Sequence, residues 1–280
     1  MQRPSQVDTL QPRRRTVTIM NIVRHGRGTP IVLLHGFEAD HRLVLSLESA
    51  LRAVPGWRRL YPDLPGFGRT PIGDVASTDD VVAEVLDLVD DELAGEQFAI
   101  LGDSFGGMVA RAVAHRRRDR VLGLGLLASV FVADASARVV PERVVLHEDT
   151  DAVAVAGDSA DDYADIAVVQ TRGNAEAFVE FAAPGAELAD GEAMKKLSEN
   201  YRLSWDPEDS EPFTQPSLII TGRQDHIVGY RDALNRLEHY PRATFVTLDE
   251  AGHNAHLDQD ALVGALVADW LRRMRPYDKR

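Results

Sequence analysis

The chain alternates short runs of apolar residues with longer segments in which apolar residues recur at helical spacing. The clearest helix is at 77–93, where valine and leucine share one face behind a capping residue, Ser77 or Thr78. Strands are predicted at 16–23, 31–34, 98–101, 121–131, 217–220 and 244–248, with another short strand beginning at Trp57. This alternation predicts an α/β fold with a mostly parallel sheet and helices on both faces.

One segment, 131–212, carries the whole charge imbalance of the chain. It contains 19 acidic and 6 basic residues, so its net charge equals the formal net charge of −13 for all 280 residues. The α/β alternation resumes after it, so we interpret it as an inserted, mainly helical cap. The predicted division is a polar N-terminal segment, 1–15, a core formed by 16–130 and 213–280, and the acidic cap.

Composition and charge exclude several classes of protein. The acidic balance argues against a nucleic-acid partner, which requires a basic face. The chain has no cysteine, so disulfides and thiolate metal sites are excluded. Residues 1–15 are polar and basic without a following apolar run, and no apolar run is long enough to span a bilayer. We therefore expect a cytoplasmic protein without a membrane partner.

Polar residues suited to catalysis follow three of the predicted strands. Ser104 lies in the sequence Gly-Asp-Ser-Phe-Gly-Gly, directly after a short apolar run. Asp225 and His253 follow two later strands. In an open parallel sheet, ligands bind beyond the carboxyl ends of the strands, so the three side chains are expected at one edge of the sheet.

A serine, a histidine and a carboxylate at one edge suit nucleophilic catalysis. A serine hydroxyl is a poor nucleophile at neutral pH unless a histidine accepts its proton during attack. The histidine needs a carboxylate on its other ring nitrogen, which fixes the tautomer and stabilises the imidazolium. The negative charge that develops on the substrate oxygen requires N–H donors.

At these residues the sequence resembles the α/β-hydrolase fold family. Gly-Asp-Ser-Phe-Gly matches the family's nucleophile elbow, G-x-S-x-G, and the order Ser104, Asp225, His253 matches the family's order. The resemblance implies that Ser104 is the nucleophile, His253 the general base and acid, and Asp225 its orienting carboxylate. It also implies an oxyanion hole formed by the backbone N–H groups of Phe37, which follows a family-like His-Gly pair, and Phe105. The acidic segment takes the place of the family's variable cap.

Each of the preferred acid and the preferred base has one alternative in the sequence. Asp134 is the alternative acid, because some members of the family carry their carboxylate after the preceding strand. It lies at the start of the acidic segment, so Asp225 is preferred. His256 competes with His253, which is preferred because it directly follows a glycine in a family-like Gly-His pair.

The remaining polar residues near these motifs receive supporting roles. Two histidines three residues apart in a loop, without an acid at ligand spacing, do not predict a metal site, and we expect neither a metal nor a cofactor. His35 is expected to support the oxyanion loop. Asp103 is expected to be a surface or supporting group that takes no catalytic role.

The serine at the elbow narrows the reaction class. Epoxide hydrolases and haloalkane dehalogenases resemble this chain but use aspartate at that position. The resemblance implies hydrolysis of a small carboxylic ester or related acyl compound through an acyl-enzyme on Ser104. A carbon–carbon bond hydrolase or an amidase with the same triad is an alternative. An acidic cap disfavours the anionic substrates of carbon–carbon hydrolases, unless an arginine such as Arg138 or Arg172 offsets its charge.

A ligand receptor built on the same fold is the alternative outside enzymes. For either reading the expected ligand is a small molecule, neutral and partly apolar. The apolar residues of the acidic segment that could line its pocket are Phe131, Val132, Tyr163, Phe178, Phe181 and Trp205. The preferred interpretation is that most of them form a small core within the segment.

Overall fold

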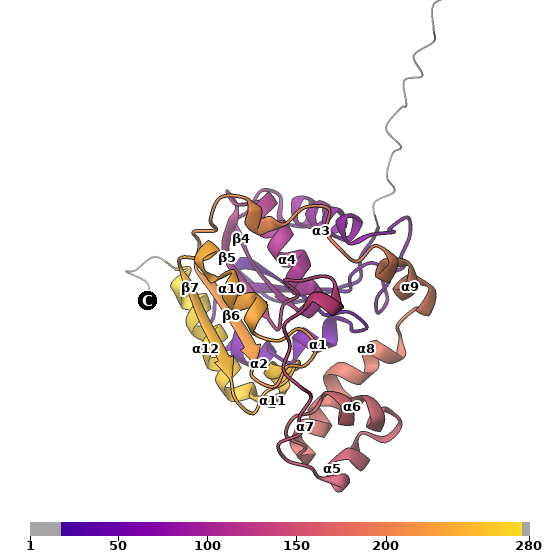
Figure 1. The fold of residues 1–280 in the computed structure, drawn as a ribbon. Coiled ribbons are helices and arrows are strands. Elements are labelled where there is room, and N and C mark those ends of the chain that lie inside the picture. The colour runs from indigo at the N-terminus through magenta and orange to yellow at the C-terminus, as the bar shows by residue number, and fades with distance from the viewer. Residues whose placement is uncertain (1–17, 276–280) are drawn as a thin grey trace, which may run out of the picture.

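The computed structural model describes residues 18–275, which form a seven-stranded sheet with helices on both faces (Figure 1). The strand order is β1-β3-β2-β4-β5-β6-β7; β1 runs antiparallel to β3, and the other neighbouring pairs are parallel. The strands are β1 (Ile22–Gly26), β2 (Thr29–Leu34), β3 (Trp57–Pro62), β4 (Phe98–Asp103), β5 (Val121–Leu127), β6 (Ser217–Gly222) and β7 (Ala243–Leu248). The predicted mostly parallel sheet is therefore confirmed, whereas the predicted segment 1–15 lies outside the described residues.

Successive residues of the central strands enter two different apolar clusters. Val32 and Leu34 pack in one cluster with α3 (Thr78–Leu93) and α4 (Ser104–Arg116). Ile31 and Leu33 pack in the other, with α2 (Glu48–Arg52) and α12 (Asp260–Arg273). This alternation follows from the two-residue period of a strand, and it shows that both faces of the sheet are buried.

Two local predictions need correction, and both corrections trace to side-chain hydrogen bonds. Of the strand predicted at 16–23, residues 16 and 17 lie outside the described part, and residues 18–21 are not in the strand, which begins at Ile22. The backbone N–H of Thr18 donates instead to Glu84, and that of Asn21 donates to the hydroxyl of Thr70. The apolar residues Leu43, Val44, Leu47, Leu51 and Val54 recur at the spacing of one continuous helix, but the structure divides this stretch into α1 (His41–Leu45) and α2.

The division between α1 and α2 occurs at Ser46. Its hydroxyl donates to the carbonyl oxygen of Leu43 at 2.6 Å, an acceptor that a continuing helix would use. The N–H of Leu47 donates instead to the oxygen of Val44, one residue closer. The α-helical hydrogen-bond pattern is therefore interrupted here, and α2 begins at Glu48.

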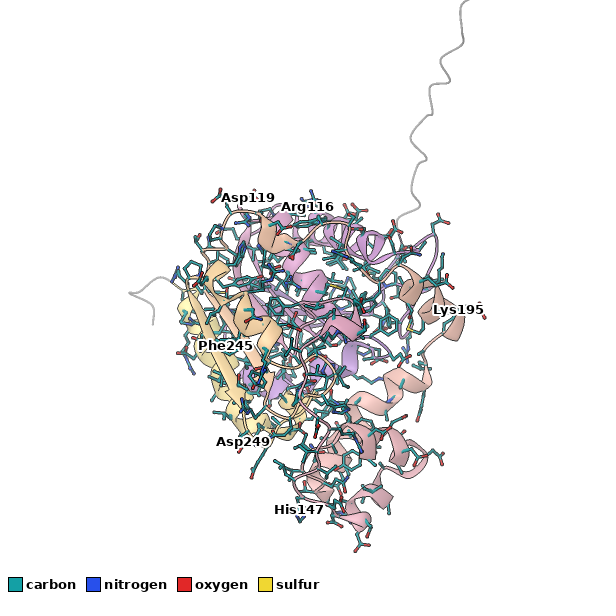
Figure 2. The ribbon with its side chains drawn as sticks, viewed as in Figure 1. Arg116, Asp119, His147, Lys195, Phe245 and Asp249 are labelled. Atoms are coloured by element: carbon teal, nitrogen blue, oxygen red, sulfur yellow. The ribbon has the colours of Figure 1, made fainter. Side chains whose placement is uncertain are left out.

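The acidic segment lies between β5 and β6 and consists mainly of short helices, in agreement with the prediction. They are α5 (Thr150–Val155), α6 (Ala160–Ile166), α7 (Arg172–Ala177), a π-helical turn (Phe178–Ala182), α8 (Ala183–Glu187) and α9 (Gly191–Glu199). Figure 1 shows α5 to α8 projecting beyond the sheet next to α11 (Ala255–Asp258). Figure 2 shows His147 and Lys195 on the outside of this segment, where both side chains are exposed.

The large apolar residues of the acidic segment have three different environments. Tyr163 and Phe178 belong to a small apolar cluster within the segment, and Phe181 packs against Leu43 of the core. Phe131 and Trp205 pack against the main core instead. The expected core of the segment therefore exists, but only part of the predicted set forms it.

The remaining helical elements are short. They comprise α10 (Arg231–Asn235) and the single 3-10 turns Ala135–Ala137, Gly157–Ser159, Pro207–Asp209 and Leu237–His239. Within residues 18–275, no helix combines the length and apolar character required to cross a membrane.

Candidate active site

Ser104 lies at a sharp junction between β4 and α4. The strand ends at Asp103 and the helix begins at Ser104, whose φ of +48° is in the left-handed region that non-glycine residues rarely adopt. A side chain at Gly102 would place its Cβ 2.2 Å from the carbonyl oxygen of Gly106, and one at Gly106 would come 2.3 Å from that of His35. Only glycine fits at either position, so the backbone can turn tightly enough to expose the Ser104 hydroxyl at the end of the strand.

The three side chains predicted from the sequence form one hydrogen-bonded series. Ser104 Oγ lies 2.9 Å from His253 Nε2, and His253 Nδ1 lies 3.1 Å from Asp225 Oδ2. The serine comes from the end of β4, the aspartate from the loop after β6 and the histidine from the loop after β7. The parallel sheet brings these loops to one edge, as expected.

Asp225 is held in place as a buried anion. Its side chain has no solvent exposure, and its second oxygen, Oδ1, accepts hydrogen bonds from the backbone N–H groups of Ile227 at 2.9 Å and Val228 at 3.0 Å. Burial opposes ionisation, but His253 and the hydrogen bonds outweigh it and lower the pKa of Asp225 below its ordinary value. The carboxylate is therefore charged and correctly oriented to accept from the histidine ring.

His253 has the electrostatic environment of a general base. Burial lowers the pKa of its imidazole, but the charge of Asp225 and the hydrogen bond to it outweigh this effect, so the pKa is raised above its usual value. The net effect favours protonation at the ring when a proton is transferred from Ser104.

The loop that carries His253 is anchored by a residue that the sequence did not single out. Asp258 accepts a hydrogen bond from the N–H of Gly252 at 2.8 Å, immediately before the histidine. Its other oxygen accepts from the side-chain amide of Asn174, in α7 of the acidic segment, at 3.0 Å. Burial raises the pKa of Asp258 to about 6. Pairing of an acid near the last helix with an amide in the segment gives no local sequence signal, so only the structure shows this link.

Phe37 and Phe105 lie on the two sides of Ser104. The Phe37 loop is so close that a Cβ at Gly36 would stand 3.3 Å from Cβ of Ser104. Phe105 is the second residue of α4, and the first N–H groups of a helix have no partner within the helix. The two aromatic rings pack edge to face at 5.5 Å. Both backbone segments are therefore positioned beside the hydroxyl, where an oxyanion would develop.

His35 stabilises the loop that carries Gly36 and Phe37. It is fully buried, its Nδ1 donates to the carbonyl of Gly36 at 2.8 Å, and its Nε2 accepts from the N–H of Leu64 at 2.9 Å. This agrees with the structural role that the sequence suggested.

Ser104 and His253 open onto a cavity of about 420 Å³ between the core and the acidic segment. Its apolar lining includes Phe37, Leu43, Ile166, Phe178, Ala182 and Ile227. Its carboxylates are Glu38, Asp103, Asp162 and Asp165, and no lysine or arginine is among the described residues that line it. Of the six apolar residues considered for the segment, only Phe178 lines this cavity; Phe131, Val132 and Trp205 line a separate one.

The competing residues have other environments. Asp134 is exposed and accepts hydrogen bonds from the backbone and hydroxyl of Ser136. His256 is 2% exposed and makes no hydrogen bond through either ring nitrogen. Asp103, expected to be a surface or supporting group, is 1% exposed, which excludes the surface position: the side chain lies beneath the elbow because the loop after β2 covers it.

The arginines that could have offset the acidic charge do not line the cavity. Arg138 donates to the carbonyl oxygens of Val132, Ala133 and Ile227. Arg172 is largely exposed and pairs with Glu176 on the same helix. Neither arginine therefore neutralises the negative charge of the carboxylates that line the cavity.

One group of described residues, Asp40, His41 and Asp63, has potential metal-ligand atoms within 4.8 Å of one another. These atoms already form hydrogen bonds. His41 Nδ1 lies 2.7 Å from Asp63, and the side-chain amide of Asn21 donates to the same carboxylate. Arg42 donates to Asp40 through two nitrogens. The hydrogen bonds account for the cluster, which we read as a structural network.

Comparisons with known proteins agree with the fold. A family model described as alpha/beta hydrolase fold matches residues 29–260. The chain is 27% identical over 271 residues to 2-hydroxymuconate semialdehyde hydrolase from a Pseudomonas species, which covers 90% of this chain and 89% of that protein. It is 24% identical over 258 residues to pimeloyl-[acyl-carrier protein] methyl ester esterase from Legionella pneumophila, at 90% and 99% coverage. An alpha/beta superfamily hydrolase from Oenococcus oeni superposes with a TM-score of 0.85 at 25% identity, covering 91% of this chain and 96% of that one.

Proposed function

The chain belongs to the α/β-hydrolase fold family, and we propose that it cleaves small carboxylic esters through an acyl-enzyme formed on Ser104. The observation that carries the proposal is the hydrogen-bonded series from Ser104 through His253 to Asp225, which opens onto a cavity large enough for a small ester.

In the first step, Ser104 Oγ attacks the ester carbonyl carbon. His253 accepts the hydroxyl proton at Nε2, and Asp225 stabilises the resulting imidazolium through the hydrogen bond at Nδ1. The backbone N–H groups of Phe37 and Phe105 donate to the oxyanion of the tetrahedral intermediate, and each such donor contributes about 3–4 kcal/mol to its stabilisation.

To complete the acyl-enzyme, the first tetrahedral intermediate collapses: the proton on His253 passes to the oxygen of the leaving alcohol, and the ester C–O bond breaks. A water molecule then takes the place of the alcohol, gives a proton to His253 and attacks the acyl-enzyme. Collapse of the second tetrahedral intermediate returns that proton to Ser104 and releases the carboxylic acid.

We further propose that residues 131–212 act as a cap that selects the substrate. Support comes from the cavity, because Ile166, Phe178 and Ala182 supply apolar lining from the segment while Asp162 and Asp165 supply carboxylates. This lining favours an acyl or alcohol group that is neutral and partly apolar. The boundaries of the cap follow the charge pattern of the sequence.

The same lining favours an ester over the anionic substrates of a carbon–carbon hydrolase. Both reactions use a serine triad, and the relatives include both a methyl ester esterase and a semialdehyde hydrolase by name. A substrate carboxylate would meet four lining carboxylates without a lysine or arginine among the described lining residues. Amide hydrolysis is compatible with this electrostatic environment and is left to experiment.

The decisive experiment combines active-site labelling with a substrate screen. A fluorophosphonate probe is expected to modify Ser104 in the wild-type protein. In the Ser104→Ala variant it is expected to modify no residue. The screen compares p-nitrophenyl esters of increasing chain length with matched amides and with vinylogous diketones, and the highest kcat/KM is expected for short or medium esters. Absence of an adduct on Ser104 would support a ligand receptor instead, and faster turnover of diketones would support the carbon–carbon hydrolase.

A further inference from the structure

Asp103 is a buried carboxylate next to the nucleophile that the proposed reaction does not use. It is 1% exposed, and its Oδ1 atom has no hydrogen-bond partner within the described structure. Burial raises the pKa of this carboxyl to about 7. A buried polar atom without a partner costs free energy, so such atoms are uncommon unless they serve a purpose. Asp103 also lines the same cavity as Ser104 and His253.

His256 is a second buried titratable group, and it lies next to Asp103. Its Nδ1 lies 3.8 Å from Asp103 Oδ1, beyond hydrogen-bond distance but close enough for a small shift to close the gap. Burial lowers the pKa of its imidazole to about 4, with the backbone of Leu43 opposing that effect, so the ring is neutral at physiological pH. A neutral ring can donate one N–H to a carboxylate, which is the partner that Asp103 lacks.

The electrostatic link between this pair and the triad runs through His253. Asp103 and Asp225 both raise the pKa of His253, whereas burial and the charge of Arg138 lower it. In return, His253 lowers the pKa of Asp103 and Asp225 raises it. His253 also lowers the pKa of His256. The carboxylate is therefore placed where its charge favours a protonated His253, the form that exists during acyl transfer.

We propose that Asp103 is a positioning residue whose charge stabilises the imidazolium of His253, and that His256 orients Asp103 through its ring N–H. The proposal rests on the proposed ester hydrolysis. It gives the elbow a second carboxylate beside the triad, which acts through its electric field at His253. No additional reactant is required, because the proton that protonates His253 is the one that Ser104 releases.

The test is the pH dependence of kcat/KM for the wild type and for Asp103→Asn, measured with the best p-nitrophenyl ester. The acid limb of this profile reports the pKa of His253 in the free enzyme. Asp103 raises that pKa to the extent that it is ionised, so its neutral isostere is expected to move the acid limb to lower pH. The plateau is expected to fall by up to about tenfold, since the same charge stabilises the imidazolium in the transition state.

A merely structural role for Asp103 would lower the melting temperature and leave the acid limb in place. An unchanged limb, or one that moves to higher pH, overturns the proposal. Asp134→Asn removes an exposed carboxylate from a neighbouring loop and serves as the matched control, with an unshifted profile expected. If Asp103→Asn does not fold, Asp103→Ser is measured in its place, because it also removes the charge and has a smaller side chain.

The role of His256 is tested separately with His256→Phe, which keeps a ring and removes both nitrogens. It is expected to shift the acid limb in the same direction by a smaller amount; an unchanged limb overturns the orienting role of His256. Failure of this inference can be distinguished from failure of the proposed function. If Ser104→Ala is inactive while Asp103→Asn has a normal profile, only the inference is wrong, whereas an active Ser104→Ala variant overturns the ester hydrolase itself.

Discussion

The catalytic edge of the sheet and the acidic segment are built in contrasting ways. The core helices α3, α4 and α12 have 16, 13 and 14 residues, and the strands between them are buried on both faces. Helices α5 to α8 have only five to seven residues each, and the apolar cluster within the segment has six buried members. The proposed chemistry is therefore assembled on the part of the molecule that has long helices and a large apolar core, whereas the segment has short helices and a small apolar cluster of its own.

Specific contacts join helices α7 and α8 of the segment to the core. Arg42 of α1 donates to the carbonyl of Pro184 in α8, and Gly185 lies so close to Asp40 that a Cβ there would come within 2.5 Å of its backbone nitrogen. Asn174 and Asp258 add the hydrogen bond that reaches the His253 loop. Variants of the core should therefore affect the chemical step, and variants of the segment should affect which substrate reacts.

The largest effect is expected from Ser104→Ala. Removal of the nucleophile should reduce turnover by a factor on the order of 10⁶, because the acyl-enzyme can no longer form. The fold should be retained, since the change deletes one atom. Steady-state kinetics and thermal unfolding of the purified variant check both statements, and normal activity would contradict the assignment of the nucleophile.

The next largest effect is expected from Asp225→Asn. An amide at this position favours the wrong imidazole tautomer, so turnover should fall by about 10⁴. Asp134→Asn is the comparison, because Asp134 is the competing acid and lies exposed outside the cavity. Kinetics of both variants decide between them: a damaging Asp134→Asn with a mild Asp225→Asn would reverse the assignment.

An intermediate effect is expected at the joint between the two regions. Asn174→Ala removes the amide that binds Asp258, which loosens the loop before His253, so kcat/KM should fall by about three- to tenfold. Arg172→Ala, on the same helix but in an exposed ion pair, should leave kcat/KM unchanged. Equal kinetics for the two variants would show that the segment does not position the histidine.

The smallest effect is expected at the rim of the cavity. Glu38 and Asp162 are exposed carboxylates, so their field is weakened by solvent and salt. Glu38→Gln combined with Asp162→Asn should improve kcat/KM for an ester bearing a carboxylate by about threefold relative to its neutral analogue. Asp161→Asn, one residue outside the cavity lining, is the control. An unchanged ratio in the double variant would mean that the rim does not select by charge.

Local patterns in the sequence were sufficient to place most elements of the core. The helix at α3 was predicted together with its cap, and Ser77 indeed accepts a hydrogen bond from the N–H of Asp80. The start of β1 and the break between α1 and α2 were not predicted, because Glu84 and the hydroxyls of Thr70 and Ser46 redirect the backbone there. A hydropathy pattern does not report such hydrogen bonds.

The sequence by itself determined the alternating α/β plan and the residues that stand at the strand ends, because periodicity and the turn glycines at 102 and 106 act within a few residues of chain. Only the tertiary structure decided which acid faces His253, which aromatic residues reach the cavity and what becomes of Asp103. Those outcomes depend on burial and on distances between residues far apart in the chain, such as the 3.8 Å between Asp103 and His256. Asp103 was read as a surface or supporting group because the sequence does not show what covers it, and the loop after β2 turns it into a buried carboxylate beneath the nucleophile.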